Sequence, residues 1–338
     1  MSTDNLSVSE HFVRAALSGA HRRGYDTRRM LTDAGISPEL LQGRQIRVSG
    51  AQFTRLMQVI WTTLQDEYMG FASVRSKPGT FATACQLLIH CHTLESVYRR
   101  GAAFYNLFDN PVSVTLRRDG EWAILEIVTQ AELFDPCHFL QESLLVIWHR
   151  LSCWLTGHRI LLDQASFNYP RPGHADEYRH LFHCALAFDQ PVTSIRFHRR
   201  YLQLPVIRDA AEMRRFLQTS PADLLARPDD RSSFTGRIRS LIGRDFSQTI
   251  PDFDSIARQL HTSPQTLRRR LREENTSFQE IKDYLRRDLA IYYLSRPDYS
   301  INEIAEKVGF TEPSTFHRAF KKWTGVTPGA YREGEREG

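Results

Sequence analysis

The chain has 338 residues, which is long for one hydrophobic core and sufficient for two domains. Hydrophobic residues make up 41% and charged residues 25% of it, a balance typical of a soluble globular protein. The sequence contains no apolar run of about 18 residues, the length that spans a membrane, and no secretory signal pattern at its N-terminus. We therefore expect a cytoplasmic protein with no membrane partner.

The net charge of +5 is unevenly distributed along the chain. From Arg231 onward the sequence carries 19 Lys and Arg against 15 Asp and Glu, so the first 230 residues are nearly neutral. This basic surplus favours an anionic partner for the C-terminal region. The five cysteines form no Cys-x-x-Cys pair, and in a reducing compartment we expect them to be buried as small hydrophobic residues.

Residues from about 8 to 108 are predicted to be mostly helical, because apolar residues recur there at helical spacing. The clearest stretches are residues 12–17, 53–64, 81–89 and 97–108.

The pattern changes at Val112. Residues 112–116 alternate as a strand does, residues 117–120 supply a turn, and residues 122–128 form a second strand, so Asp119-Gly120 predicts a hairpin. A long apolar helix from Pro136 to Thr156 follows. Shorter strands are expected at residues 164–169, 185–188 and 194–197. The first part of the chain is thus an α+β domain with a small, mostly antiparallel sheet.

Residues 219–233 are polar and rich in Pro and Asp, which is typical of a domain boundary. We expect a sensing or dimerisation domain over 1–220, a linker over 221–232 and an all-helical domain over 233–338.

The all-helical domain contains the same helix-turn-helix pattern twice, at about 252–274 and 300–323. Capping residues mark the helix starts: Asp252, Ser263 before Pro264, Ser277 with Glu280, Ser300 with Glu303, and Thr327 before Pro328. Between the two units, residues 278–294 predict one linker helix of about 25 Å. Successive major-groove faces of DNA lie about 34 Å apart, so such a helix could hold the units on adjacent grooves.

Each unit separates apolar from polar positions. The apolar positions expected to share one core are Ile256, Leu260, Leu267, Leu271, Ile304, Val308, Phe316 and Phe320. The residues expected to face outward from the two recognition helices are Gln265, Thr266, Arg268, Arg269, Arg272, Ser314, His317, Arg318 and Lys321. Arg pairs bidentately with guanine and Gln with adenine, at about 1–3 kcal/mol of discrimination per contact. These features predict sequence-specific binding of double-stranded DNA.

Residues 252–332 resemble the DNA-binding domain of the AraC/XylS family of transcription regulators. The resemblance is carried by Ile304-Ala305-x-x-Val308-Gly309-Phe310, by Pro313-x-x-Phe316-x-Arg318-x-Phe320, and by Trp323, Gly325, Pro328, Tyr331 and Arg332. It implies that Gln265, Arg268, Arg269, Ser314, His317 and Arg318 read bases. Pro313 occupies a position where some relatives place a base-reading polar side chain, so we expect the first recognition helix to supply the main discrimination.

The N-terminal domain resembles the arabinose-binding-type sensing domain of the ornithine- and virulence-regulator branch of this family. The resemblance rests on residues 77–80 and on residues 167–182. Its helical opening is unlike the barrel of the arabinose sensor itself. Candidate walls of an effector pocket are the aromatic residues Phe81, Tyr105, Phe108, Trp148 and Trp154. The alternative is that these rings belong simply to the core.

Two groups of residues invite a metal interpretation: His90-Cys91-His92, and the pair His149 and Cys153. Adjacent residues on a helix point in different directions, and no second pair has matching spacing. The sequence also lacks a glycine-rich phosphate loop and a credible nucleophile beside its histidines. We expect no metal, no cofactor and no catalytic residues.

The resemblance implies a one-component transcription regulator, most often an activator, that contacts promoter DNA and RNA polymerase. A homodimer and a small-molecule effector are expected partners. One alternative is a DNA-binding protein whose N-terminal domain only dimerises. The other is a DNA-targeted enzyme of the alkyl-DNA repair type, which needs a zinc-held cysteine cluster near the N-terminus, whereas the first cysteine here is Cys85.

Overall fold

The computed structural model describes residues 7–38, 47–108, 111–129, 133–182, 184–220, 224, 234–242, 251–274, 276–294, 298–324 and 326–336. The chain divides into two compact units. The first comprises Met1–Arg14, Thr27–Leu56 and Asp229–Gly338, and the second comprises Ala15–Asp26 and Met57–Pro228. The expected linker at 221–232 lies, apart from Leu224, outside the described residues, as does Gly325 of the family motif.

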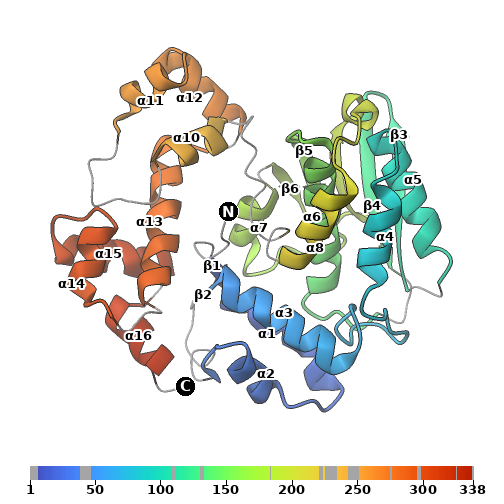
Figure 1. Cartoon of the computed structure of the whole chain (residues 1–338), viewed down its shortest axis with the longest axis horizontal. Coiled ribbons are helices and arrows are strands. Elements are labelled where there is room, and N and C mark those ends of the chain that lie inside the picture. Colours follow the sequence, from blue (N-terminus) through green and yellow to red (C-terminus); the bar gives the residue numbers. More distant parts are fainter. Residues whose placement is uncertain are drawn as a thin grey trace. The chain divides into compact units, whose positions relative to one another are not determined.

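The first unit contains the helix-turn-helix region (Figure 1). Its helices are α2 (Thr27–Asp33), α10 (Phe234–Ile242), α11 (Phe253–Gln259), α12 (Pro264–Glu273), α13 (Phe278–Leu294), α14 (Ile301–Lys307), α15 (Pro313–Thr324) and α16 (Pro328–Arg336). The linker helix α13 has the bounds that the sequence predicts. All eight apolar positions of the two units lie in one hydrophobic core, which α10 and Tyr331 of α16 complete.

The predicted caps account for where these helices begin. Asp252 accepts a hydrogen bond from the Ser255 N–H at 2.6 Å, and Ser263 accepts one from the Thr266 N–H at 3.1 Å. Ser300 and Glu303 form a reciprocal capping box at the start of α14. Each cap satisfies backbone donors that a helix N-terminus leaves unpaired.

Two long-range contacts in the first unit have no signal in the local sequence. The carboxylate of Glu274 accepts the N–H groups of Phe234 and Thr235, both at 2.9 Å, and so caps α10 from the end of α12. The short antiparallel strands β1 (Ser7–Ser9) and β2 (Arg47–Ser49) pack against α13. There the buried Tyr331 hydroxyl donates to the Arg47 carbonyl. The helix-turn-helix core is therefore tied to segments more than two hundred residues away.

The second unit is built on one five-stranded sheet. Its strands are β3 (Val112–Asp119), β4 (Trp122–Thr129), β5 (Leu162–Ser166), β6 (Ala185–Ala187) and β7 (Thr193–His198), in the order β3-β4-β7-β5-β6. The pair β5–β6 is parallel and the other neighbours are antiparallel. This confirms the predicted α+β fold with a small, mostly antiparallel sheet.

The predicted hairpin is tighter than expected. Arg117, Arg118 and Asp119 continue the strand instead of turning, and Asp119 pairs with Trp122. The loop is therefore Gly120 and Glu121, with Gly120 at a φ of 55°. Two-residue hairpin loops require such a left-handed conformation, which glycine adopts at little cost.

The second unit also contains the helices α4 (Thr80–Leu88), α5 (Leu94–Tyr105), α6 (Phe139–Thr156), α7 (Ala175–Phe182) and α8 (Ala210–Thr219), with a 3-10 turn η3 (Arg199–Gln203). Helix α5 packs against β3, and α6 packs against β4 and β7. The helices α1 (Glu10–Arg22) and α3 (Gly50–Leu64) have their first residues in the first unit and the rest in the second. Of the 18 residues of α6, 13 are buried. A helix that is buried nearly all round lies inside a core rather than on its surface.

Polar residues on α6 must find partners inside the protein, since an unpaired buried polar group is costly. The Ser152 hydroxyl lies 2.8 Å from the Tyr98 hydroxyl, and His149 Nε2 lies 2.8 Å from the Ile160 carbonyl. The Arg150 guanidinium donates to the Leu224 carbonyl.

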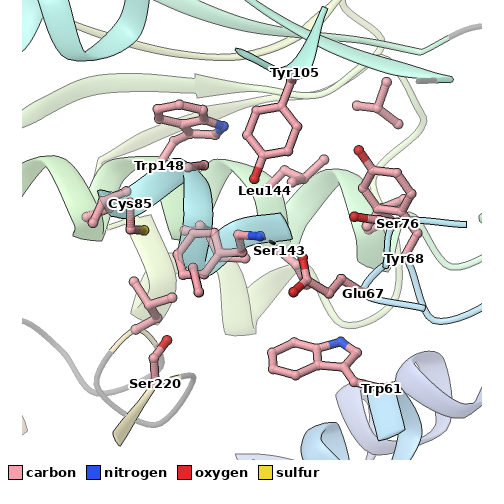
Figure 2. A pocket seen from close by; sticks show the side chains of 18 of the residues that line it. Trp61, Glu67, Tyr68, Ser76, Cys85, Tyr105, Ser143, Leu144, Trp148 and Ser220 are labelled. Carbon is pink, nitrogen blue, oxygen red and sulfur yellow. Dashed lines mark hydrogen bonds between the residues drawn. The ribbon is translucent and has the colours of Figure 1, made fainter. Parts of the chain in front are cut away.

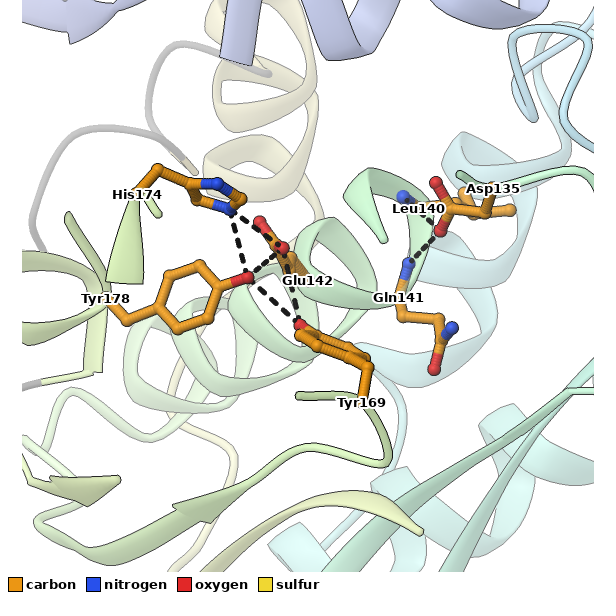
Figure 3. A network of polar contacts seen from close by, with 7 residues as sticks. All are labelled: Asp135, Leu140, Gln141, Glu142, Tyr169, His174 and Tyr178. Atoms are coloured by element: carbon orange, nitrogen blue, oxygen red, sulfur yellow. Dashed lines mark hydrogen bonds and ion pairs between the residues drawn. The ribbon is translucent and has the colours of Figure 1, made fainter. Parts of the chain in front are cut away.

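A buried network is centred on Glu142 of α6 (Figure 3). Its Oε1 accepts hydrogen bonds from the hydroxyls of Tyr178 and Tyr169, and His174 Nε2 lies 3.7 Å from the same atom. The ring of His138 stacks on that of Tyr169 with centroids 3.6 Å apart. Burial raises the pKa of Glu142 to about 8, although both tyrosine hydrogen bonds oppose the shift. Neutral Glu142 is thus the form that this environment favours.

A second buried carboxylate lies just before α6. Asp135 accepts the N–H groups of Leu140 and Gln141 at 2.9 and 3.2 Å. Burial is the main cause that raises the pKa of Asp135 to about 7.

These shifts predict that the second unit loses stability between about pH 6.5 and 8. A carboxyl whose pKa is raised on folding binds more protons in the folded state, so the free energy of unfolding falls as the pH rises from the ordinary pKa of the group to its folded pKa, and levels off above it. The slope is about 1.4 kcal/mol per pH unit for each proton. Burial lowers the pKa of His149 to about 4, but that group affects stability only below its ordinary value of 6.5.

Thermal unfolding followed by tryptophan fluorescence measures this effect, since Trp61, Trp122, Trp148 and Trp154 all lie in the second unit. Glu142→Gln should flatten the decline above pH 6.5. The control Glu121→Gln, at an exposed turn position, should retain it. A wild-type melting temperature that stays constant or rises over this range contradicts the assignment.

Candidate DNA interface and ligand pocket

The expected base-reading residues lie on α12 and α15. Seven of the nine are exposed: Gln265, Arg268, Arg269, Arg272, Ser314, Arg318 and Lys321. Thr266 and His317 are half-buried. Opposite them, Leu267, Leu271, Phe316 and Phe320 are almost fully buried. Each helix therefore presents a polar face while its apolar face anchors it to the core.

Local contacts orient the polar face of α12. The Ser263 hydroxyl donates to Thr266 Oγ1 at 2.9 Å, so the Thr266 side chain takes part in the helix cap. The Arg268 guanidinium lies 5.2 Å from the centre of the Phe253 ring on α11. This stacking limits the rotamers of Arg268 before any partner binds, which reduces the entropy lost on contact.

The start of α15 is less basic than that of α12. Ser314 Oγ lies 3.5 Å from the carboxylate of Glu312, and Pro313 contributes no polar side chain. Basic residues on α15 begin at Arg318, whereas α12 carries Arg268, Arg269, Arg270 and Arg272. The stronger positive charge of α12 is one reason to expect that it supplies the main discrimination, which stays a prediction.

Helix α13 joins the two helix-turn-helix units, and Figure 1 shows α11 and α12 toward one of its ends and α14 and α15 toward the other. Its 17 residues correspond to about 25 Å. A continuous helix that shares one core with both units cannot act as a flexible tether. The spacing of the two recognition helices is therefore fixed by α13.

The second unit encloses a cavity of about 220 Å³ (Figure 2). Helix α6 provides one wall, through Leu140, Ser143, Leu144, Ile147, Trp148 and Leu151. Helices α3, α4, α5 and α8, strand β3 and the loop between α3 and α4 contribute to the others, together with Ser220 and Leu224. Most of the lining is apolar or aromatic, as in small-molecule sites.

Three of the five aromatic residues proposed from the sequence line this cavity: Phe81, Tyr105 and Trp148. Phe108 and Trp154 do not. Phe108 is 48% exposed and packs edge-on against Phe104. Trp154 stacks on Phe216 of α8 with centroids 4.3 Å apart, so its ring joins two helices.

Gly101 of α5 sets the position of one wall. A Cβ at this residue would lie 2.3 Å from a ring carbon of Trp148, far closer than atoms approach. The indole therefore packs directly against the backbone of α5.

Sequence reasoning missed the polar residues of the cavity, which include Trp61, Glu67, Tyr68 and Ser143. Glu67 reaches the start of α4 across a loop: its carboxylate accepts the N–H groups of Gly79 at 2.7 Å and Phe81 at 2.9 Å. The Lys77-Pro78-Gly79-Thr80 motif marks that helix start, but nothing in it indicates which side chain caps it.

The pair His149 and Cys153, considered for metal binding, makes contacts within the protein. His149 lies 3.7 Å from Cys153 Sγ, and its Nε2 also contacts the Ile160 carbonyl. Within the described ranges, no three His, Cys, Asp or Glu side chains form a group that could hold a metal ion.

Cys85, Cys91 and Cys153 are buried as expected, whereas Cys137 and Cys184 are partly exposed. None of the helices in the described part of the chain is long and apolar enough to cross a membrane.

The fold and the paired helix-turn-helix units define a DNA-binding transcription regulator. The arabinose-binding N-terminal domain of AraC transcription regulators matches residues 24–206, and a helix-turn-helix domain matches residues 256–334. Because the first match alone spans more than half of the chain, the protein belongs to the AraC family of transcription regulators. This confirms the resemblance found in the sequence.

Two relatives of similar sequence agree with this assignment. The chain is 28% identical to the ornithine utilization regulator of Pseudomonas aeruginosa over 327 residues, which is 95% of each protein. It is 28% identical to the regulator VirS of Mycobacterium tuberculosis over 167 residues, 49% of this chain and 48% of VirS. The crystal structure of the regulator CdpR from Pseudomonas aeruginosa aligns with 96% of this chain and 98% of its own, at 20% identity and a TM-score of 0.34.

Removing one arginine from α12 should weaken specific DNA binding. Arg268→Ala or Arg269→Ala is expected to reduce affinity by about 1–3 kcal/mol and to relax the preference at one base pair. Selection of bound sequences from a random pool, followed by titration of the preferred duplex, measures both effects. The control is Arg99→Ala, an equal loss of charge at an exposed position on α5. If both α12 variants keep the wild-type affinity and preference, α12 does not read bases.

Proposed function

We propose that this protein is a one-component regulator that binds two adjacent major grooves of promoter DNA and responds to a small effector held in the second unit. The observation that carries the DNA-binding part is the pair of recognition helices anchored in one core with α13 between them. The proposal extends to activation of transcription, contact with RNA polymerase and homodimer formation, as the family resemblance implies. It also extends to the cytoplasm as the site of action, since DNA is the target.

The proposal assigns sensing to residues 1–220 and DNA binding to residues 233–338, with the boundary at 221–232. Base contacts are assigned to the exposed residues of α12 and α15, with α12 as the main reader. An effector changes DNA binding only if it binds one state of the protein more tightly than another. Dimerisation would raise the avidity for paired sites without new base contacts.

A rigid α13 makes the spacing of the two DNA sub-sites a strict requirement. The sub-sites contacted by α12 and α15 should lie about 10 bp apart, one helical turn of DNA. Inserting 5 bp between them turns the second sub-site to the opposite face of the duplex. Affinity should then fall to that of a duplex carrying one sub-site. The measurement is a titration of each duplex with the full-length protein. If the duplex with the 5 bp insertion binds as tightly as the original duplex, the two helices do not bind together.

The effector role predicts coupling between the cavity and DNA affinity. Amino acids, including the ornithine that the name of one relative suggests, amines and fatty acids form a suitable first screen by thermal shift. A ligand at one hundred times its Kd stabilises the protein by about 2.7 kcal/mol.

Leu144→Trp, which fills the cavity, should abolish the stabilisation, whereas Leu87→Trp on the exposed face of α4 should keep it. The same compound should change the affinity for operator DNA. If no compound that occupies the cavity alters DNA affinity, the alternative of a purely dimerising N-terminal domain is favoured.

A further inference from the structure

The cavity of the second unit has one acidic group whose orientation is fixed. Both carboxylate oxygens of Glu67 accept backbone N–H groups at the start of α4. A carboxylate oxygen can accept a second hydrogen bond. The cap therefore holds Glu67 in place while leaving it able to bind a donor from a ligand in the cavity that it lines.

The lining supplies no positive charge to balance this acid. Among the described residues that line the cavity there is no Lys, Arg or His. Arg150 of α6 directs its guanidinium to the Leu224 carbonyl, and Arg23 lies 3.9 Å from the neighbouring carboxylate of Asp66. Burial is the main cause that raises the pKa of Glu67, and the charge of Asp66 adds to it. A cation in the cavity would lower the pKa of Glu67 again, because it stabilises the ionised carboxylate.

Aromatic rings complete the surroundings of Glu67. Trp61, Tyr68 and Tyr105 line the same cavity (Figure 2), and so does Phe81. Burial raises the pKa of Tyr68 and Tyr105, and in both the charge of Glu67 adds to the shift. Aromatic faces attract organic cations, most strongly where water is excluded. The indole Nε1 of Trp61 is buried without a hydrogen-bond partner in the described part of the chain.

We propose that this cavity binds a small organic monocation, an amine or quaternary ammonium group on an apolar body, with the cationic group at Glu67 and the body against the apolar wall of α6. The proposal rests on the effector role proposed above and names the chemical class of the effector.

The same chemistry disfavours other common effectors. The carboxylate of a fatty acid or an amino acid would be buried near Glu67 without a cation, which is costly. A polyamine would carry a second ammonium group, yet Glu67 is the one acidic residue among the described lining residues.

Three ligands with the same eight-carbon chain test the proposal: octylamine, octan-1-ol and octanoate. Each is titrated calorimetrically into the full-length protein. Octylamine is expected to bind about tenfold more tightly than the neutral alcohol, the size of one charge-assisted contact, and octanoate is expected to bind most weakly. Octanoate binding as tightly as octylamine, or no binding of the amine, overturns the proposal.

Variants of the cavity separate the charge of Glu67 from its role as a cap. Glu67→Gln should lower the affinity for octylamine to that for the alcohol. Because this change also weakens the cap, a second variant adds a base instead: Ser143→Lys, on the wall formed by α6, should abolish the preference for the amine. Ser143→Met matches the lysine in length without its charge and should keep the preference. If Glu67→Gln and Ser143→Lys both still bind octylamine more tightly than the alcohol, Glu67 is not the group that binds the cation.

The effect on DNA distinguishes this proposal from the effector role itself. If octylamine binds as expected but leaves the operator affinity unchanged, the ligand class stands and the effector role fails. If a carboxylate effector changes the operator affinity and Leu144→Trp blocks it, the effector role stands and the cationic ligand class fails.

Discussion

The burial of α6 is the constraint on which the second unit depends. A helix that is covered on nearly all sides must place its polar residues against partners from other elements, and those partners fix the surrounding helices and strands. One face of α6 forms the wall of the cavity through Leu144 and Trp148. Another holds Glu142 against Tyr169 and Tyr178. The cavity wall and the Glu142 network therefore share one helix, and a substitution on either face of α6 affects the position of the other.

Local patterns in the sequence predict the DNA-binding helices well. Capping residues and helical periodicity are properties of a few neighbouring residues, and α13, with its bounds at Phe278 and Leu294, follows from them. The expected hairpin also forms, although its turn is shorter because the strand pairing continues through Asp119. Pairing energy between strands is not visible in a single segment, so the exact end of a strand is harder to predict.

Contacts between distant segments account for what the sequence could not predict. The cap of α10 by Glu274, the hydrogen bond from Tyr331 to Arg47 and the position of Glu67 at the start of α4 each join residues that no local pattern relates. The candidate pocket shows the same limit. Aromatic composition indicated Phe81, Tyr105 and Trp148, but the polar group that we infer to select the ligand lies in a loop whose path depends on the folded unit.

The contact between Gly101 and Trp148 bears on how ligand choice could diverge among relatives. Trp148 lines the cavity, and its position depends on the absence of a side chain at residue 101, which does not line it. Exchanging that glycine for alanine would push the indole toward the cavity and reduce its volume. Two proteins could thus share every lining residue and still admit ligands of different size. Their ligand specificities would then differ because of a substitution at residue 101, outside the cavity lining, and a comparison of lining residues alone would miss it.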